Sequence, residues 1–588
     1  MRLVEIRLLE GPNVYRLEPV VKVELALGRR RTWYGERAPL RHALVRLGAS
    51  VPTREHPAPV RALIAWSRRL RTDFGEPGDP ARVHRSSDPG HWIATWGWTG
   101  AERAQLIAEA AVALVERGVP PERLADLRPA HERLLATWSG RIAAARATPP
   151  SWVRDEERRM PVVSITGTNG KSTVTRLITH ILVRAGRRVG TTTSDGVLVD
   201  ERLVEPGDWT GPGGAHLVLR RSDLDAAVLE TARGGIVLRG MGYQSNEASV
   251  FTNVSADHLD LQGIHTLPEL AEVKSVICRI TKRDGWTILN ADDPLVLAVA
   301  RRVRARVALF SMAARPTAAV RRHLAAGGRA YLVERDWLVE IEGDDRRPIA
   351  EVVTLPVTIG GIARHNVANA LAAAGGARAM GASIAEVAEG LRSFAPSADR
   401  SPGRLNLYRV GGRIVIVDFA HNEAGIAAVL DVAAGIAGGA AGRAAPVTAI
   451  IGTAGDRPDD TLRGIGRIAA QRADRVAIKE TRHYLRGRTA ASMIGELRAG
   501  IAAAGRSVDD VPVYPTETAA LRAELGAGSR PGDGSRPDAP RVIVLMCHEE
   551  REGVFALLDE LGARPIDVAT ELHALLPRLQ RAGQAATG

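Results

Sequence analysis

The spacing of apolar and polar residues divides the chain into three segments. Residues 3–27 contain two β-like runs on either side of a Gly-Pro-Asn turn, and this pattern predicts two strands. Residues 101–118 then carry apolar side chains at three- and four-residue spacing, which is typical of a helix that buries one face. We therefore expect a small α+β domain over residues 1–150.

The second segment predicts a mostly parallel sheet. It opens with a short apolar strand at residues 161–165, a glycine loop and a helix from about residue 171 to 185. Apolar runs and helical patterns then alternate, as βαβ units require. Short, turn-rich strands at residues 302–358 indicate an antiparallel excursion. We expect this central domain to span residues 155–400.

The third segment predicts a second doubly wound unit over residues 401–588. It contains four apolar runs, each followed by a glycine-rich or polar loop and a helical pattern, at residues 412–422, 447–456, 475–481 and 541–549. The expected fold class is therefore α/β, with a central P-loop domain and a C-terminal doubly wound domain behind the small N-terminal domain.

Composition narrows the class of protein. The 588 residues carry a formal net charge of +12, with 45% hydrophobic and 25% charged residues, which is ordinary for a folded soluble protein. Two cysteines are too few for a disulfide framework or a multi-cysteine metal site, which suggests a reducing compartment. The opening residues lack the apolar core of a signal peptide. The most apolar long stretch, at about residues 424–445, is interrupted by Asp431 and rich in glycine, which favours a soluble helix and linker over a membrane span. We expect a cytoplasmic protein with no membrane partner.

The basic residues give a sharper signal than the total charge. Arginines alternate with Asp and Glu and form no dense basic tail, so the charge favours anionic small molecules or acidic peptides over nucleic acid. Five of the 79 basic residues are lysine: Lys22, Lys171, Lys274, Lys282 and Lys479. Arginine can replace lysine as a solvated charge but not as a compact or deprotonatable amine. Each remaining lysine is therefore a candidate for a specific role.

The clearest chemical motif is Gly-Thr-Asn-Gly-Lys-Ser-Thr at residues 167–173, between a strand and a helix. Glycines let backbone N–H groups and the helix N-terminus face a phosphate. Lys171 would reach the β- and γ-phosphates, and the Ser172 hydroxyl would bind Mg²⁺. The motif is not a full Walker A pattern, because Ile165 stands where its first glycine is expected. The alternative is a glycine turn with one exposed lysine.

Three further features fall where a phosphate site would need them. Glu230 ends an apolar strand and can supply a second Mg²⁺ ligand, although it could be an ordinary strand-end acid. His258 shares a loop with Asp257 and Asp260, and a structural role and a metal or phosphate role both stay open. Lys274 follows on the next helix, where the alternative is a solvated lysine.

The order of these motifs resembles that of the Mur ligase superfamily, which includes the peptidoglycan peptide ligases and folylpolyglutamate synthase. The motifs are GTNGKST, the strand-end Glu230, NVSADHLD, LNADDP, ARHNVANALAAA and VDFAHN. Finer motifs resemble the cyanophycin synthetase branch, namely LLEGPNVYRL, GDWTGPGGA, LETARGGIVLRG, GTAGDRPDD and LRGRTAA. The resemblance covers nearly the whole chain and implies an ATP-dependent amide ligase, in which a carboxylate becomes an acyl phosphate that an amine attacks.

The resemblance also implies a role for each matching residue. ATP would be held by Gly167, Thr168, Asn169, Gly170, Lys171, Ser172, Thr173, Asn290, His365, Asn366, Asn369, Arg404, Asp418 and His421. Magnesium would be held or organised by Ser172, Glu230, His258 and Lys274. Lys171, His258 and Lys274 are the implied catalytic residues, and Lys274 matches a lysine that is carbamylated in many members. Candidates for the substrate side are Arg233, Asp456, Arg457, Arg486 and Arg488.

The chain departs from the branch in one large respect. Cyanophycin synthetase has an ATP-grasp domain between its N-terminal and Mur-type domains, whereas here Met160 leads directly into the P-loop strand. The implied activity is therefore only that of the Mur-type half, which in the family joins arginine to an aspartate side chain. The carboxylate acceptor, the amine and any homo-oligomer stay open. Smaller departures are Phe419 for tyrosine and Glu423 for proline.

Other functions remain as alternatives. A Mur-type ligase could act on a peptidoglycan-like or folate-like substrate, although those enzymes do not open with this N-terminal domain. The chain could instead be a non-catalytic nucleotide-binding partner of a separate ATP-grasp ligase, which the retained Lys171, Glu230 and Lys274 argue against. A nucleic-acid ATPase is the least favoured alternative, and salt-sensitive binding to DNA or RNA that stimulates ATP hydrolysis would support it. In the N-terminal domain, Trp92, Trp96 and Trp98 could form core or a polymer-contact surface, and core is favoured.

Overall fold

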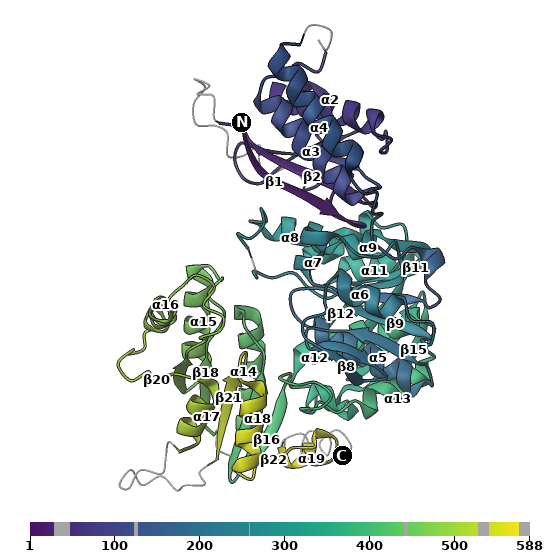
Figure 1. The fold of residues 1–588 in the computed structure, drawn as a ribbon. Helices are drawn as coiled ribbons and strands as arrows, with labels where there is room; N and C mark the ends of the chain where they lie inside the picture. The colour runs from purple at the N-terminus through teal and green to yellow at the C-terminus, as the bar shows by residue number, and fades with distance from the viewer. Residues whose placement is uncertain (29–46, 123–126, 258, 440–444, 527–539, 576–588) are drawn as a thin grey trace.

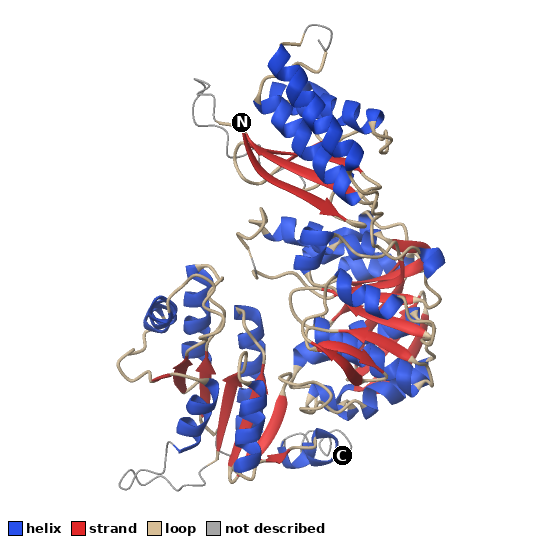
Figure 2. Ribbon diagram, in the orientation of Figure 1, coloured by secondary structure: helices blue, strands red, loops and turns tan. Residues whose placement is uncertain are grey.

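The protein is an α/β chain with three sheets that follow one another along the sequence (Figures 1 and 2). The computed structural model describes residues 1–28, 47–122, 127–257, 259–439, 445–526 and 540–575. Within these ranges, no helix combines the length and apolar character needed to cross a membrane. The α/β fold class predicted from the sequence is confirmed.

The N-terminal sheet is antiparallel, with the order β1-β2-β4-β3. Its strands are β1 (Arg2–Leu9), β2 (Val20–Ala26), β3 (Arg82–Arg85) and β4 (His91–Gly97), and its helices are α2 (Ala58–Asp73), α3 (Ala101–Glu116) and α4 (Pro129–Ala144). Trp96 and Trp98 are buried in the core beneath these helices. Trp92 is half-buried, with the Arg85 guanidinium 4.9 Å from its ring centroid. Two of the three tryptophans therefore belong to the core.

The central sheet has the order β15-β14-β13-β12-β11-β10-β5-β9-β6-β7-β8. Its strands are β5 (Val162–Thr166), β6 (Val189–Thr192), β7 (Gly196–Val199), β8 (Arg202–Pro206), β9 (Ala226–Glu230), β10 (Asn246–Phe251), β11 (Thr281–Asn290), β12 (Arg306–Ser311), β13 (Arg329–Glu334), β14 (Trp337–Glu342) and β15 (Asp345–Glu351). From β13 to β6 all neighbours are parallel, and β14–β15 and β7–β8 extend the two edges in antiparallel fashion. The mostly parallel sheet matches the sequence prediction, but of the strands at residues 302–358 only β14 and β15 add in antiparallel fashion, and the antiparallel edge at β7–β8 was not predicted.

Helices cover both faces of the central sheet. One face packs against α5 (Lys171–Arg184), α12 (Arg364–Ala379) and α13 (Ile384–Ser393). The other packs against α6 (Pro212–Leu219), α7 (Arg233–Arg239), α8 (Leu267–Lys274), α9 (Val276–Arg279), α10 (Pro294–Leu297) and α11 (Ala318–Ala325). Because both faces are covered, the strands are continuous apolar runs and their polar residues gather at the carboxyl ends.

The C-terminal sheet has the order β20-β19-β18-β21-β17-β16-β22. Its strands are β16 (Asn406–Val410), β17 (Arg413–Asp418), β18 (Val447–Ile451), β19 (Arg475–Lys479), β20 (Val513–Tyr514), β21 (Arg541–Met546) and β22 (Arg564–Pro565). Its helices are α14 (Glu423–Gly439), α15 (Asp459–Arg472), α16 (Ala490–Ala503), α17 (Glu517–Gly526), α18 (Arg551–Glu560) and α19 (Val568–Leu575). Neighbouring strands from β20 to β17 are parallel. Strand β16 pairs antiparallel with β17, and β22 pairs antiparallel with β16. This arrangement fits a doubly wound unit.

Helices α15 and α16 pack backbone against backbone, and this contact gives a stability prediction. A Cβ at Gly500 would lie 1.9 Å from the Arg463 carbonyl oxygen, whereas a Cβ at Gly495 on the same helix meets nothing within 4 Å. We expect Gly500→Ala to lower the free energy of unfolding by about 1–3 kcal/mol because the helices must separate. Gly495→Ala should raise it by about 0.5–1 kcal/mol through helix propensity. Urea unfolding followed by circular dichroism measures both, and equal effects would contradict the close approach.

Candidate functional site

A cavity of about 860 Å³ lies where the carboxyl ends of the central and C-terminal sheets meet. Its lining includes these residues predicted from the sequence: Thr168, Asn169, Gly170, Lys171, Ser172, Thr173, Glu230, Arg233, Lys274, Asn290, His365, Asn366, Asn369, Arg404, Asp418, His421, Asp456, Arg457 and Arg486. Gly167 and Arg488 are not part of the lining, and His258 lies outside the described residues. The roles of all these residues remain predictions.

The loop between β5 and α5 forms one wall of the cavity. Gly170 has a φ of 84°, and a Cβ there would lie 2.3 Å from the Asn369 side-chain oxygen, so only glycine fits without a shift. The loop ends at the first turn of α5, whose free N–H groups and dipole favour an anion. Lys171 Nζ donates to the Thr168 carbonyl at 2.9 Å, so its charge lies beside the loop. This is the geometry of a phosphate-binding loop.

A buried carboxylate faces this loop from the end of β9. The Ser172 hydroxyl donates to Glu230 Oε1 at 3.1 Å, and Glu230 Oε2 has no hydrogen-bond partner among the described residues. Burial raises the pKa of Glu230, although the charges of Lys171 and Arg404 oppose the shift. A hydroxyl and a carboxylate oxygen are hard ligands of the kind that Mg²⁺ prefers. The unsatisfied Oε2 therefore fits a cation held between Ser172 and Glu230.

Lys274 ends helix α8, which begins with a Thr266–Glu269 capping box. Its side chain is buried, and Nζ donates to the Gly167 carbonyl at 2.6 Å. Burial, together with the nearby Lys171 charge, lowers the pKa of Lys274 well below its usual value. The amine is therefore suited to exist in its neutral form. A neutral amine is the form that can react with carbon dioxide to give a carbamate, so the site fits the predicted modification.

Amide side chains form the part of the cavity beyond the loop. Asn290 donates to the Thr252 carbonyl at 2.8 Å, and Asn369 donates to the Asn366 side-chain oxygen at 2.9 Å. Burial lowers the pKa of His365 to about 4, so its ring is neutral at pH 7. Neutral polar groups of this kind suit a nucleobase better than a phosphate.

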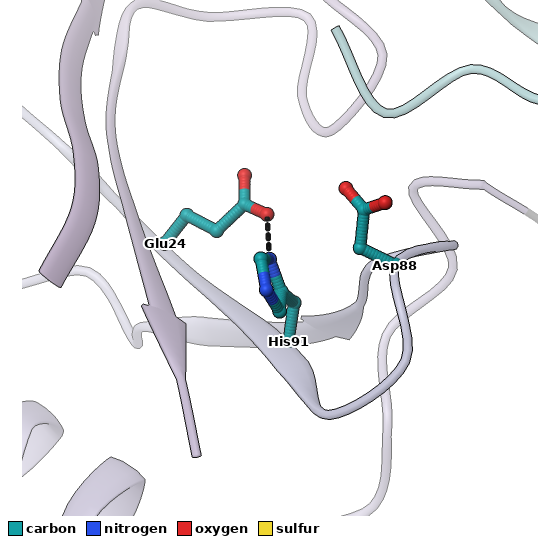
Figure 3. Close-up of side chains that lie close together, drawn as sticks. All are labelled: Glu24, Asp88 and His91. Carbon is teal, nitrogen blue, oxygen red and sulfur yellow. Dashed lines mark hydrogen bonds and ion pairs between the residues drawn. The ribbon is translucent and has the colours of Figure 1, made fainter. Parts of the chain in front are cut away.

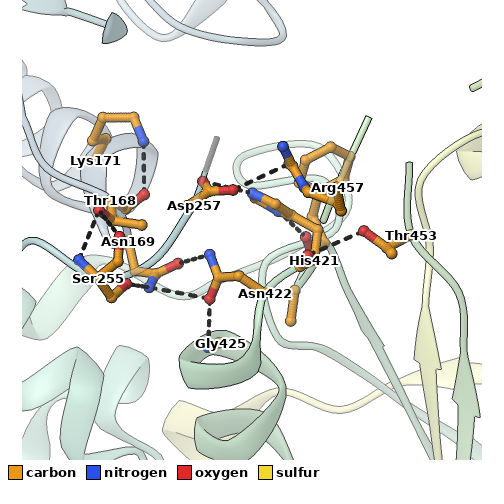
Figure 4. Close-up of polar contacts among 12 residues, drawn as sticks. Thr168, Asn169, Lys171, Ser255, Asp257, His421, Asn422, Gly425, Thr453 and Arg457 are labelled. Atoms are coloured by element: carbon orange, nitrogen blue, oxygen red, sulfur yellow. Dashed lines mark hydrogen bonds and ion pairs between the residues drawn. The ribbon is translucent and has the colours of Figure 1, made fainter. Parts of the chain in front are cut away.

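The C-terminal sheet closes the opposite side (Figure 4). Asp418 accepts hydrogen bonds from the Leu405 and Ala420 backbone N–H groups, each at 2.8 Å, which fixes the turn after β17. The Asn422 side chain donates to Asn169 of the loop at 3.0 Å, and the reverse donation measures 3.3 Å. The loop after β5 and the turn after β17 therefore contact each other directly beside the cavity.

Charged residues gather around Asp257 and Asp456 in the cavity lining. Asp257 lies 3.5 Å from His421 Nε2 and 3.3 Å from the Arg457 guanidinium (Figure 4). Arg233 donates to the Leu261 carbonyl at 3.1 Å, and Arg486 pairs with a carboxylate at the cavity edge, that of Asp456, at 2.7 Å. The remaining substrate candidate, Arg488, pairs with Asp459 and does not reach the cavity. This part of the cavity offers both signs of charge to a zwitterionic or acidic substrate.

Sequence reasoning missed several residues in or next to the cavity. Asp195 accepts from Arg176 at 2.7 Å and from Arg551 at 2.6 Å, which links the central sheet to α18. His548 itself lines the cavity, behind the turn that follows β17. Asn422 could have been chosen because it follows His421 directly. The other contacts join residues far apart in the chain, for which no local motif is a signal.

A second group of potential metal ligands lies in the N-terminal sheet, apart from the cavity (Figure 3). Glu24, Asp88 and His91 bring three ligand atoms within 4.8 Å of one another. Glu24 already accepts from His91 at 2.9 Å and pairs with Lys22 at 2.9 Å. Because these partners satisfy the buried carboxylate, we assign no metal to this group.

Because Oε2 of the buried Glu230 has no partner among the described residues, we expect the ionised carboxylate to lower the stability of the ligand-free protein. A group whose pKa is raised on folding stabilises the folded state at low pH and loses that contribution as pH rises through its folded pKa. Glu230→Gln in ligand-free protein should therefore unfold at a higher urea concentration than the wild type at about pH 8, with a smaller difference at about pH 5. The exposed Glu205 provides the control Glu205→Gln, for which we expect no such pH dependence. A lower midpoint for Glu230→Gln at the higher pH would contradict the assignment.

Comparisons with known proteins identify the family. Residues 165–377 match the Mur ligase middle domain, and residues 403–534 match the Mur ligase glutamate ligase domain. Cyanophycin synthetase of Crocosphaera subtropica is 42% identical over 322 residues, which are 55% of this chain and 36% of that protein. That of Synechocystis sp. is 41% identical with the same coverage, so the chain spans about a third of these relatives' length.

Solved structures of related fold were also found, at low sequence identity. The solved structure of E. coli FolC in complex with DHPP and ADP covers 72% of this chain and 98% of its own, at 17% identity and a TM-score of 0.49. The family rests instead on the two domain matches, which together take in more than half of the chain. With its middle and C-terminal domains both matched in the expected order, the chain belongs to the Mur ligase family.

Proposed function

We propose that this protein is an ATP-dependent amide ligase that activates a carboxylate as an acyl phosphate and joins it to an amino acid or amine. The observation that carries the proposal is the buried Glu230 carboxylate, whose Oε1 accepts from the Ser172 hydroxyl and whose Oε2 has no partner among the described residues. A buried carboxylate oxygen without a partner is costly, and a bound Mg²⁺–nucleotide would satisfy it. The identity to cyanophycin synthetases supports a ligase of that type.

The side chains suit each part of this reaction. A carboxylate and the γ-phosphate repel each other, and Lys171 and Arg404 would offset that repulsion. Bound Mg²⁺ would further neutralise phosphate charge, with Ser172 and Glu230 as its ligands and Lys274 as an organising group. The contact of Asn169 with Asn422 would help to exclude water, which would otherwise hydrolyse the acyl phosphate. The amine then displaces phosphate and forms the amide.

The charged part of the cavity supports an acidic or peptide-like acceptor. Arg233, Arg457 and Arg486 line it and would attract a carboxylate, while Asp257 and Asp456 would attract an ammonium. We propose an amino acid as the amine, and a separate ATP-grasp ligase as one source of the acceptor. The cytoplasm is the proposed location, because the reaction consumes ATP. The division at residues 1–150, 155–400 and 401–588 is retained as a proposal.

Phosphate release gives the first test of the proposed function. Purified protein with ATP and Mg²⁺ should release phosphate only when pools of acidic peptides and amino acids are both present, because amide formation needs both substrates. Mass spectrometry should then find a product whose mass is that of acceptor plus amine minus water. If a folded, nucleotide-bound protein responds to no pair from these pools, the ligase proposal fails.

Lys274→Arg distinguishes an active ligase from a nucleotide-binding scaffold. Arginine is always charged and cannot be carbamylated. We expect kcat to fall by about 100-fold or more, as when a group that organises transition-state charge is lost, while ADP binding is retained. Lys282→Arg is the matched control, because Lys282 is partly exposed and pairs with Glu247 at 2.8 Å away from the cavity. Equal turnover in both variants would favour the scaffold.

A further inference from the structure

A buried lysine lies behind the C-terminal wall of the cavity. Lys479 ends β19 and its side chain is 0% exposed, as expected only when a charge is compensated. Its Nζ donates to Glu517 Oε1 at 2.5 Å and also lies 3.0 Å from His548 Nδ1. Glu517, at the start of α17, is equally buried. These three side chains form one connected group.

Their chemistry fixes which atom carries each proton. Burial alone would raise the pKa of Glu517, but the Lys479 charge and the hydrogen bond from the His548 backbone N–H help to lower it to about 2, so it is a carboxylate. A lysine ammonium can only donate, so His548 Nδ1 accepts and the proton lies on Nε2. That Nε2–H donates to the Ala420 carbonyl at 3.0 Å. Both ring nitrogens are therefore occupied, and His548 is placed to hold the backbone rather than to transfer a proton.

The same carboxylate orders the backbone on the other side of His548. Glu517 accepts from the backbone N–H of His548 at 2.6 Å and of Glu550 at 2.8 Å, and from Cys547 Sγ at 3.1 Å. This turn leads into α18, whose first residue, Arg551, pairs with Asp195 of the central sheet. The group therefore connects the ends of β19 and β21 to the contact between the two sheets.

The target of the group is the turn that contains Asp418 and His421. Phe419 packs edge-on against His548, with ring centroids 5.2 Å apart, and the Arg404 guanidinium lies 4.7 Å from the Phe419 ring. Phe419, Ala420, His421 and His548 all line the cavity. Holding the Ala420 carbonyl thus sets the position of the side chains on both sides of it.

Lysine is also the cation that fits this position. A Cβ at Gly452 would lie 2.6 Å from Lys479 Cε, so the amine stem passes closely over the neighbouring strand end. The wider guanidinium of arginine needs more room than a single ammonium. The chain has 74 arginines and only five lysines, so the presence of lysine at this narrow position agrees with a need for the smaller cation.

We propose that Lys479, Glu517 and His548 are positioning residues, which hold the Ala420–His421 turn against the nucleotide side of the cavity. The inference rests on the proposed function, because that function makes this turn part of the ATP site. Groups that face His548 are Lys479, Glu517 and His421, and Cys547 lies beside it on the chain.

The first experiment needs no substrate. The full chain labelled with ¹⁵N-histidine gives imidazole ¹⁵N shifts, and His548→Gln assigns the His548 signals. We expect a neutral Nε2–H tautomer that does not titrate between about pH 6 and 8, because burial and the Lys479 charge hold the pKa of His548 well below its usual value. An Nδ1–H tautomer, or titration near its usual pKa, would overturn the proposal.

The second experiment measures positioning. The double variant Lys479→Met/Glu517→Gln removes both charges, so no unpaired buried ion is left to unfold the chain. We expect the Kd for Mg²⁺–ADP by calorimetry and the KM for ATP to rise about tenfold, because the displaced turn carries residues proposed to contact the nucleotide. Lys282→Met is the control and should match the wild type.

These outcomes separate the inference from the proposed function. Wild-type ADP affinity in the double variant would show that the group is structural only and would overturn the inference, even if the protein is an active ligase. A wild-type protein that forms no amide would refute the proposed function, whereas the ADP affinities and the His548 tautomer would still decide the role of Lys479.

Discussion

The site depends on one constraint. Two separate sheets, each built mostly of parallel strands, direct the carboxyl ends of those strands at a single cavity. At these ends the chain leaves the ladder, so polar side chains and free backbone groups collect there. From the central sheet come the P-loop, Glu230 and Lys274, and from the C-terminal sheet come Asp418, His421 and Arg457. Neither sheet supplies the whole set, so the chemistry proposed for this family member requires both to face each other.

Contacts across the cavity hold this arrangement. Asn169 and Asn422 exchange hydrogen bonds, and Asp195 pairs with Arg551 of the C-terminal unit and Arg176 of α5. In the cavity, Glu230 lacks a partner for Oε2 among the described residues, and Lys274 is buried with a lowered pKa and a hydrogen bond to the Gly167 carbonyl. Groups with perturbed pKa values therefore gather in the cavity, as is common at functional sites.

Local features of the chain were predicted well from the sequence. The strand, glycine loop and helix around Lys171 and the strand end at Glu230 lie where periodicity and motif indicated, because both are encoded by neighbouring residues. Packing between distant segments was not predictable in this way. Asp195 meets Arg551 across 356 positions, and Lys479 meets His548 across 69. The scarcity of lysine drew attention to all five lysines alike and assigned no role to Lys479, whose partners only the tertiary structure shows.

The central claim, that a carboxylate is activated by ATP before it meets an amine, is tested most directly by oxygen transfer. An acidic peptide labelled with ¹⁸O in its carboxylates would be incubated with the protein, ATP, Mg²⁺ and the amine that supports turnover. Breakdown of an acyl phosphate by the amine leaves one carboxylate oxygen on phosphorus, so the account predicts one ¹⁸O atom in each phosphate released. Phosphate without the label would show that water, and not a carboxylate, attacks ATP, and would contradict the account.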